Sequence, residues 1–203
     1  MIHDMGGKYH HGDLHAELVR VSLDLIAEQG VEGFSVAQVA KRANVSAAAP
    51  YRHFPDRSSL MSAVAAAAAC RLRDLVDKVI TEEPDPVTRL ASAQGTYTRF
   101  FIDTRLGFPV LFADGLANPE YTEMHDQRRA MFDTFLTLSL AVTDGHATAL
   151  ELLEQLNAQS HGYGALYLDG VSPRMGYSAD QVVAKSTRAA RIVIEAYRTA
   201  GQR

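Results

Sequence analysis

Residues 34–60 read FSVAQVAKRANVSAAAPYRHFPDRSSL, and this stretch decides the fold. Ser35 and Gln38 have the spacing of a capping box, in which two polar side chains close the first turn of a helix. Asn44 follows that helix, and asparagine is, after glycine, the residue that best tolerates the left-handed conformation of a tight turn. Ser46 can cap a second short helix. The stretch therefore predicts two short helices joined by a left-handed turn.

Two helices joined in this way form a helix-turn-helix, whose second helix presents its N-terminal residues to the major groove of DNA. Residues 36–57 hold four basic side chains against a single acid, Asp56. Tyr51 and His53 add donors that can reach phosphate oxygens. The alternative is a helical hairpin with a solvated charged face, and the periodicity alone does not separate the two interpretations.

The residues quoted above resemble the DNA-binding domain of the TetR family of bacterial transcriptional regulators. The resemblance covers about residues 13–64, including an amphipathic helix that ends at Gly30. It implies that residues 46–51 form the recognition helix and that Tyr51 and His53 contact phosphate. The full set of residues expected to contact DNA is Ser35, Lys41, Arg42, Ser46, Ala47, Ala48, Ala49, Tyr51, Arg52, His53 and Arg57.

Three positions depart from the family pattern. Asn44 replaces the usual turn glycine, and Ser58 stands where an acidic residue is frequent. Pro50 lies within the expected recognition helix, where it removes a backbone donor and disfavours a helical conformation for Ala49. The alanine run also leaves few side chains that hydrogen-bond to bases. We therefore expect apolar contacts with thymine methyl groups, and polar readout by Lys41, Arg42 or Arg52.

The rest of the chain reads as helix, because apolar residues recur at steps of three and four. Sustained two-residue alternation, which indicates strands, is missing. The sequence therefore predicts an all-α fold, with a helix-turn-helix domain at residues 8–56 and a larger helical core at residues 57–203. Ser178 and Gln181 match a capping box for the last helix. Long helices are expected at residues 13–29, 57–80, 87–103, 107–116, 119–143, 147–169 and 179–199.

Composition limits the class of protein. The chain has 203 residues, 47% of them hydrophobic, and a formal net charge of −4. It is therefore expected to fold, and it does not coat nucleic acid through bulk positive charge. The single cysteine, Cys70, excludes an internal disulfide and reads as a small buried residue. No apolar run approaches the roughly 20 residues that span a bilayer, so we expect a cytoplasmic protein without membrane contact.

The resemblance further implies a C-terminal core that binds a small-molecule effector. Clustered aromatic side chains with a few polar groups suit such a pocket, and the alternative is that most of them are core residues. His161 is expected to pack between helices or to be a buried, hydrogen-bonded side chain. The candidate pocket residues are Tyr97, Phe100, Phe101, Phe108, Phe112, Tyr121, Met124, His125, Arg128, Phe132 and Tyr163.

Dimerisation through the last two long helices is also implied by the resemblance. Residues 160–163 and 169–170 resemble the Trp-His-Gly subgroup of the family, with Asn157 at the expected tryptophan position. The alternative is that the same residues pack within one subunit. The candidate interface residues are Gly162, Gly164, Ala165, Val182, Ala189, Val193 and Tyr197, with Val183, Ala190 and Ile194 widening the seam on the last helix.

Catalytic motifs are missing from the sequence. It has no Glu-x-x-His pair of a di-iron bundle, no glycine-rich phosphate loop and no recognisable nucleophile. We therefore expect no enzyme activity, no cofactor and no metal. The predicted function is that of a homodimeric repressor, which binds a near-palindromic double-stranded DNA operator and is released by a small-molecule effector of unknown identity. The alternative is a DNA-binding helical dimer without an effector.

Overall fold

The computed structural model describes residues 14–111 and 118–201. Within these ranges the protein is helical and contains no strand, as the sequence predicted. None of the described helices is long and apolar enough to cross a membrane. The helices in chain order are α1 (Leu14–Gln29), α2 (Val36–Arg42), the 3₁₀ turn η1 (Pro50–Arg52), α3 (Arg57–Ile80), α4 (Pro86–Thr104), α5 (Phe108–Leu111), α6 (Thr122–Leu140), α7 (His146–Leu168), α8 (Val171–Arg174) and α9 (Ala179–Gly201).

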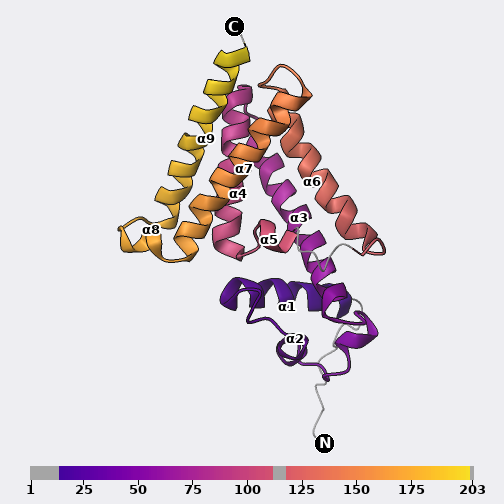
Figure 1. Ribbon diagram of the computed structural model, residues 1–203. Coiled ribbons are helices and arrows are strands. Elements are labelled where there is room, and N and C mark those ends of the chain that lie inside the picture. The colour runs from indigo at the N-terminus through magenta and orange to yellow at the C-terminus, as the bar shows by residue number, and fades with distance from the viewer. Residues whose placement is uncertain (1–13, 112–117, 202–203) are drawn as a thin grey trace, which may run out of the picture.

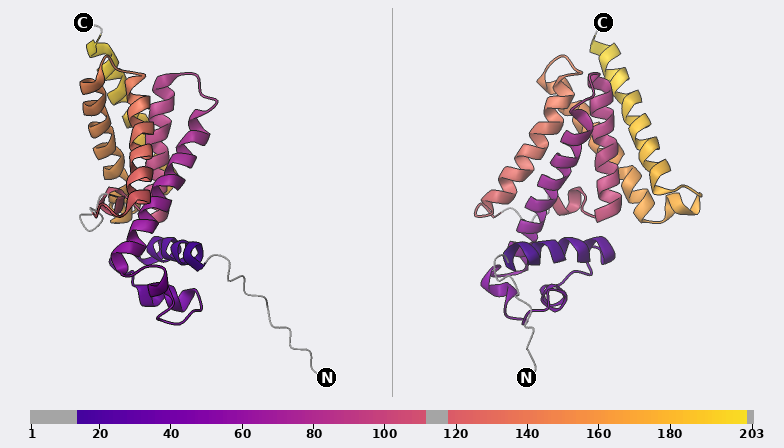
Figure 2. Two further views of the ribbon diagram at one scale, coloured as in Figure 1. Left: turned by 90° about the vertical axis from the view of Figure 1, so that its right-hand side faces the viewer. Right: turned by 180° about the vertical axis from the view of Figure 1, so that it is seen from behind.

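The molecule has a small N-terminal unit and a larger helical core. Helices α1 and α2 lie together at one end, and the core of long helices lies beyond α1 (Figure 1). Within the core, α7 and α9 lie on one side and α3 on the other (Figure 2, left). Helix α3 starts beside the N-terminal unit and runs into the core, where it packs against α4 and α6. The fold is therefore a helix-turn-helix unit followed by a helical bundle.

The turn after α2 has the predicted left-handed conformation. Asn44 has a φ of 55°, which asparagine adopts more readily than most residues because its short polar side chain tolerates this region. Beyond it, the Val45 N–H donates to the Ala40 carbonyl at 3.0 Å. This bond closes the end of α2 and directs the chain into the following segment.

That segment is shorter and tighter than the helix the sequence predicted. The Ala49 N–H donates to the Ser46 carbonyl at 3.0 Å, and the Arg52 N–H donates to the Ala49 carbonyl at 3.2 Å. Only residues 50–52 form a helical turn, and Ala49 rather than Ser46 is its N-cap. The cause is Pro50, which lacks the N–H that an α-helix starting at Ser46 would need at this position.

Helix α3 has a fixed start and an alanine-rich middle. The Ser59 N–H donates to the Asp56 carboxylate at 2.7 Å, and the Asp56 N–H donates to the Ser59 hydroxyl at 3.2 Å. This reciprocal cap satisfies backbone N–H groups at the helix end. Residues 65–69 are alanines, which favour helix and lose little side-chain entropy. The predicted bounds of this helix, 57–80, are confirmed.

Other predicted bounds differ by a few residues. Helix α6 ends at Leu140, and α5 ends at Leu111, beyond which part of the predicted 107–116 helix lies outside the described residues. Helix α8 was not predicted, because a single turn after Gly170 (φ 75°) has no periodicity to detect. The capping box of α9 is confirmed: the Gln181 N–H donates to the Ser178 hydroxyl at 3.3 Å, and the Ser178 N–H donates to the Gln181 side chain at 2.9 Å.

A buried polar network joins α4, α7 and α9. The Ser160 hydroxyl donates to Gln94 Oε1 at 2.8 Å, and the hydroxyls of Thr98 and Ser186 lie 2.8 Å apart. Thr98 also donates to the Ser160 carbonyl at 3.2 Å. All four side chains are buried. Because a buried polar group costs free energy unless it is hydrogen-bonded, these contacts fix how the three helices sit against one another.

His161 packs between helices, as expected. Its Nδ1 lies 2.9 Å from the Tyr97 hydroxyl of α4, and its ring stacks on Phe101 with centroids 4.4 Å apart. Gly164, one turn further along α7, leaves room for the Phe101 ring, since a Cβ there would lie 2.5 Å from it. Burial lowers the pKa of His161 below its ordinary value of 6.5, because a desolvated imidazole disfavours the charged form.

This lowered pKa predicts a pH dependence of stability. Below pH 6.5 the unfolded chain takes up a proton at this position more readily than the folded protein, so the free energy of unfolding falls as the pH drops. Above that pH the contribution is fully present. Denaturant unfolding at about pH 7.5, 6.5 and 5.5 should show a steeper loss for the wild type than for His161→Gln, whose side chain does not titrate. Parallel losses in the two proteins would contradict this role.

Candidate nucleic-acid interface

The reading segment, which we define as residues 46–53, lies at the end of the molecule remote from the C-terminus (Figure 1). Its side chains divide into an anchored and an exposed set. Pro50 is buried, and so is Phe54, which follows the segment and is 4% exposed. Tyr51 is 53% exposed. The outward-facing residues are Ala47, Ala48, Tyr51, Arg52 and His53, together with Ser46 at the start of the segment, while Ala49 is half-buried.

Aromatic contacts tie the reading segment to α1. The ring of His15 lies 4.5 Å from that of Phe54 and 6.3 Å from that of His53, measured between centroids. Phe54 packs in the same apolar core as the buried side chains of α1, such as Leu18 and Val21. A movement of α1 therefore acts on the base of the reading segment.

The basic side chains predicted to contact DNA differ in whether they also make contacts within the protein. Lys41 and Arg52 are exposed. Arg42 donates to Glu28 at 2.7 Å, and this bond lowers the pKa of the Glu28 carboxyl. The Arg57 guanidinium donates to the Val31 carbonyl at 3.2 Å and also lies 5.6 Å from the centroid of the Phe34 ring. Arg42 and Arg57 thus also hold local structure, whereas Lys41 and Arg52 present their charge outward.

Ser35 is the N-cap residue of α2. Its hydroxyl accepts from the Gln38 N–H at 3.3 Å and donates to Gln38 Oε1 at 2.9 Å. It therefore caps the helix that precedes the turn, in agreement with the predicted spacing. Since the side chain is half-buried, a contact with DNA would come on top of this capping role.

The candidate pocket residues differ in how far they are buried, and one of them, Phe100, lines a cavity. Tyr97, Phe101 and Met124 are buried in the core, and Phe100 is 2% exposed. Phe132 is 37% exposed. Tyr121, His125, Arg128 and Tyr163 are half-buried, and His125 Nδ1 lies 3.3 Å from Arg128 Nη2. The Phe108 side chain and Phe112 lie outside the described residues.

Two cavities among the described residues lie beside α1. One, which we call the junction groove, has a volume of about 380 Å³ and lies between α1, α3 and α6. The other, of about 210 Å³, lies between α1, α3 and α4, and Leu23 borders both. Cys70 of α3 is half-buried and lines the junction groove, so it is less enclosed than the sequence suggested. Sequence reasoning missed both cavities, because each is built from segments far apart in the chain.

The candidate interface residues lie on α7 and α9 but are not equally accessible. Gly164 and Val182 are buried within the subunit. Gly162, Ala165, Ala189, Val193 and Tyr197 are half-buried. The Tyr197 hydroxyl accepts from Gln155 at 2.6 Å and so links the two helices. Two large apolar side chains on these helices that the sequence analysis did not name are exposed: Leu166 of α7 at 48% and Ile192 of α9 at 67%.

Comparison with known proteins supports a single family. Residues 18–64 match the model of the bacterial regulatory proteins of the tetR family. No curated protein sequence matches the chain. A solved structure of a protein of unknown function from Rhodococcus sp. RHA1 is 27% identical, with a TM-score of 0.71 over 91% of this chain and 97% of that one.

Two further solved structures are similar in fold. A transcriptional regulator from Rhodococcus sp. Rha1 is 20% identical, with a TM-score of 0.66 over 91% of this chain and 96% of that one. A variant of TetR from Acinetobacter baumannii AYE, in complex with minocycline, is 16% identical, with a TM-score of 0.62 over 92% of this chain and 97% of that one. The family match covers residues of α1, the turn and the start of α3, and the whole described fold agrees with it. Residues 18–64 are therefore similar to the bacterial regulatory proteins of the tetR family, and the described fold is similar to that of solved transcriptional regulators.

Proposed function

We propose that this protein is a homodimeric DNA-binding transcriptional repressor that a small-molecule effector releases from its operator. The observation that carries the proposal is the reading segment: after a left-handed turn, it presents Tyr51, Arg52 and His53 outward on a chain with a net charge of −4. Local basic charge on an acidic chain favours a contact confined to this end of the molecule. Such a regulator acts in the cytoplasm, on chromosomal DNA.

We assign the two proposed roles to two consecutive parts of the chain. Residues 8–56 form the DNA-binding unit, and residues 57–203 form the effector-binding and dimerisation core. In the complex, the reading segment enters the major groove with Ala47 and Ala48 against base edges. Because alanine carries no hydrogen-bonding group, the direct readout is of thymine methyl groups. Of the remaining contact residues, Ser35, Lys41, Arg42 and Arg57 lie beside the segment, and Ser46, Ala49, Tyr51, Arg52 and His53 lie within it. Tyr51, Arg52, His53 and Arg57 contact phosphates, and Lys41 or Arg42 supplies polar readout of bases.

A dimer is required because one short reading segment buries little surface. Two segments related by a two-fold axis fit successive major grooves about 34–36 Å apart, which makes the operator near-palindromic. The proposed interface lies on α7 and α9 and uses Gly162, Ala165, Ala189, Val193 and Tyr197. The exposed apolar side chains of Leu166 and Ile192 extend it, since large apolar groups on a surface commonly mark contact sites.

The effector part of the proposal is supported by the minocycline complex of the TetR variant, which has a similar fold. An effector acts only through its different affinity for the two states of the protein. A second candidate function, a DNA-binding dimer without an effector, is favoured by the close packing of Tyr97, Phe101 and His161. The Trp-His-Gly subgroup stays a prediction.

The experiment that tests the proposal is selection of DNA fragments from the source genome with the purified full chain. A symmetric motif should emerge from the bound fragments, and fluorescence anisotropy should then show salt-dependent binding to it. Selection that yields no motif at low salt would overturn the repressor function. Titration of small metabolites into the complex then separates the two candidates, because only the effector-responsive protein dissociates.

Substitution of Arg52 tests the phosphate contacts. Arg52→Ala should weaken binding to all DNA sequences alike and lower the slope of log K against log salt concentration by about 1, because one fewer counterion is released. Arg198→Ala removes the same charge at the opposite end of the molecule and should leave both quantities unchanged. A loss limited to one base of the operator would contradict the phosphate role and indicate direct readout.

The dimer interface is tested at Ile192. Ile192→Glu should convert the dimer to a monomer at micromolar concentrations in sedimentation velocity, because a charge in an apolar interface has no partner there. It should also reduce operator affinity by an order of magnitude or more. Val79→Glu is the matched control, since Val79 is a 43% exposed apolar residue of α3. If both variants stay dimeric, the interface lies elsewhere.

A further inference from the structure

We propose that the junction groove is a ligand site for a small organic amine with an apolar body. The groove has a volume of about 380 Å³, within the range of about 300–1,000 Å³ that is typical of small-molecule sites. It is not lined by any of the aromatic residues that the sequence suggested for an effector. The inference therefore names a new site for the ligand and rests on the proposed function only for its effect on DNA binding.

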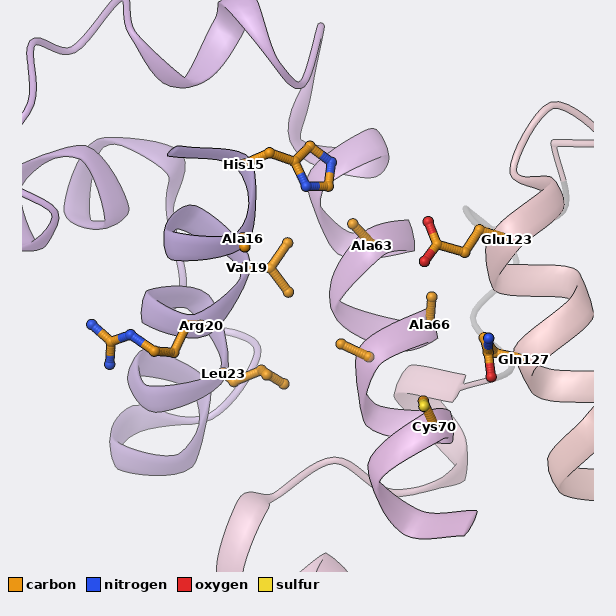
Figure 3. A pocket seen from close by; sticks show the side chains of 11 residues that line it. His15, Ala16, Val19, Arg20, Leu23, Ala63, Ala66, Cys70, Glu123 and Gln127 are labelled. Atoms are coloured by element: carbon orange, nitrogen blue, oxygen red, sulfur yellow. The ribbon is translucent and has the colours of Figure 1, made fainter. Parts of the chain in front are cut away.

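The floor of the groove is apolar because its residues are small. Ala63, Ala66 and Ala67 of α3 line it, and Val19 and Leu23 of α1 form the facing wall (Figure 3). The alanine tract that favours α3 as a helix also leaves this space open beside it. An apolar ligand body of matching size would replace water against these side chains.

The α6 wall supplies hydrogen-bond acceptors. Glu123 and Gln127 lie one turn apart, and the Glu123 side chain points toward α3 (Figure 3). Gln127 Oε1 is buried and has no hydrogen-bond partner among the described residues. A buried acceptor without a donor destabilises the protein that contains it. A ligand N–H group that reached Gln127 would satisfy this acceptor, and Glu123 would balance a positive charge.

The opposite wall does not repel a cation. Arg20 is the only arginine or lysine that lines the groove among the described residues. Its guanidinium is held by Glu17 and by Asp24, each at 2.7 Å, and it points away from the groove (Figure 3). Apart from the His15 imidazole and the Gln127 amide, which can donate as well as accept, the polar group on the ligand space is the Glu123 carboxylate. This negative charge favours an amine over a carboxylic acid.

His15 connects the groove with the reading segment. It lines the groove, and its ring packs on Phe54 at 4.5 Å between centroids and lies 6.3 Å from that of His53. A ligand wedged between α1 and α6 therefore presses on the helix that supports the reading segment. We expect occupancy to lower operator affinity at least about fivefold, the lower end of typical allosteric coupling.

Binding is tested on the full chain without DNA, so that the outcome does not depend on the proposed function. Isothermal titration calorimetry with 4-phenylbutylamine should give one site per subunit, and 4-phenylbutyrate should bind at least tenfold more weakly. Equal affinities for the two probes would overturn the assignment of an amine, and no binding of either would overturn the site.

Two variants locate the site. Ala67→Leu fills the groove and should weaken amine binding at least tenfold, whereas Ala147→Leu, at an exposed position in the first turn of α7, should leave it unchanged. Gln127→Met keeps the side-chain size but removes the acceptor, and should weaken binding several-fold without lowering Tm. If Ala67→Leu instead changes the association of subunits and amine binding persists, the groove is a protein contact and the proposal is wrong.

Coupling is tested with the selected operator. The amine should lower operator affinity in the wild type. Phe54→Leu changes a residue that packs on His15 but does not line the groove, so it should reduce this shift while calorimetry still detects the amine. An unchanged operator affinity with the amine bound would overturn the coupling. A protein that binds no operator at all would overturn the proposed function instead, while the calorimetry still decides whether the groove takes the amine.

Discussion

Helix α3 packs in both the N-terminal unit and the helical core, and the rest of the structure depends on this connection. It packs against α1 at the N-terminal end and against α4 and α6 in the core. The reciprocal cap of Asp56 and Ser59 fixes where it begins. Because a packed helix of 24 residues moves largely as a rigid rod, a tilt set in the core reaches the N-terminal unit. Arg105 adds a second link, since it donates to the Ala27 carbonyl of α1 at 3.1 Å.

The reading segment combines a rigid base with a surface of small side chains. Pro50 limits the backbone to a single 3₁₀ turn, and Phe54 holds that turn to α1. Alanines at positions 47 and 48 allow a close approach to DNA but offer no hydrogen bonds to bases. Under the proposed function, these two positions read bases only through apolar contact with thymine methyl groups.

Local sequence patterns predicted the helices, but they did not predict contacts between segments that are distant in the chain. The bounds of α3, the left-handed Asn44 and the capping box of α9 each follow from a few neighbouring residues, so periodicity and capping rules found them. Periodicity does not tell which neighbour a helix face meets, and this is why it does not show that Leu166 and Ile192 lie exposed on α7 and α9. The junction groove depends on α1, α3 and α6 together, and no single stretch of sequence carries its signal.

The polar network among Gln94, Thr98, Ser160 and Ser186 has a mechanical consequence. Its donors and acceptors match in only one axial register of α4, α7 and α9, and sliding by one helical turn would leave each buried group unsatisfied, at about 1–3 kcal/mol apiece. These three helices therefore move as one block. A change of shape in the protein then falls on helices outside that block, and the long helices among them are α1, α3 and α6.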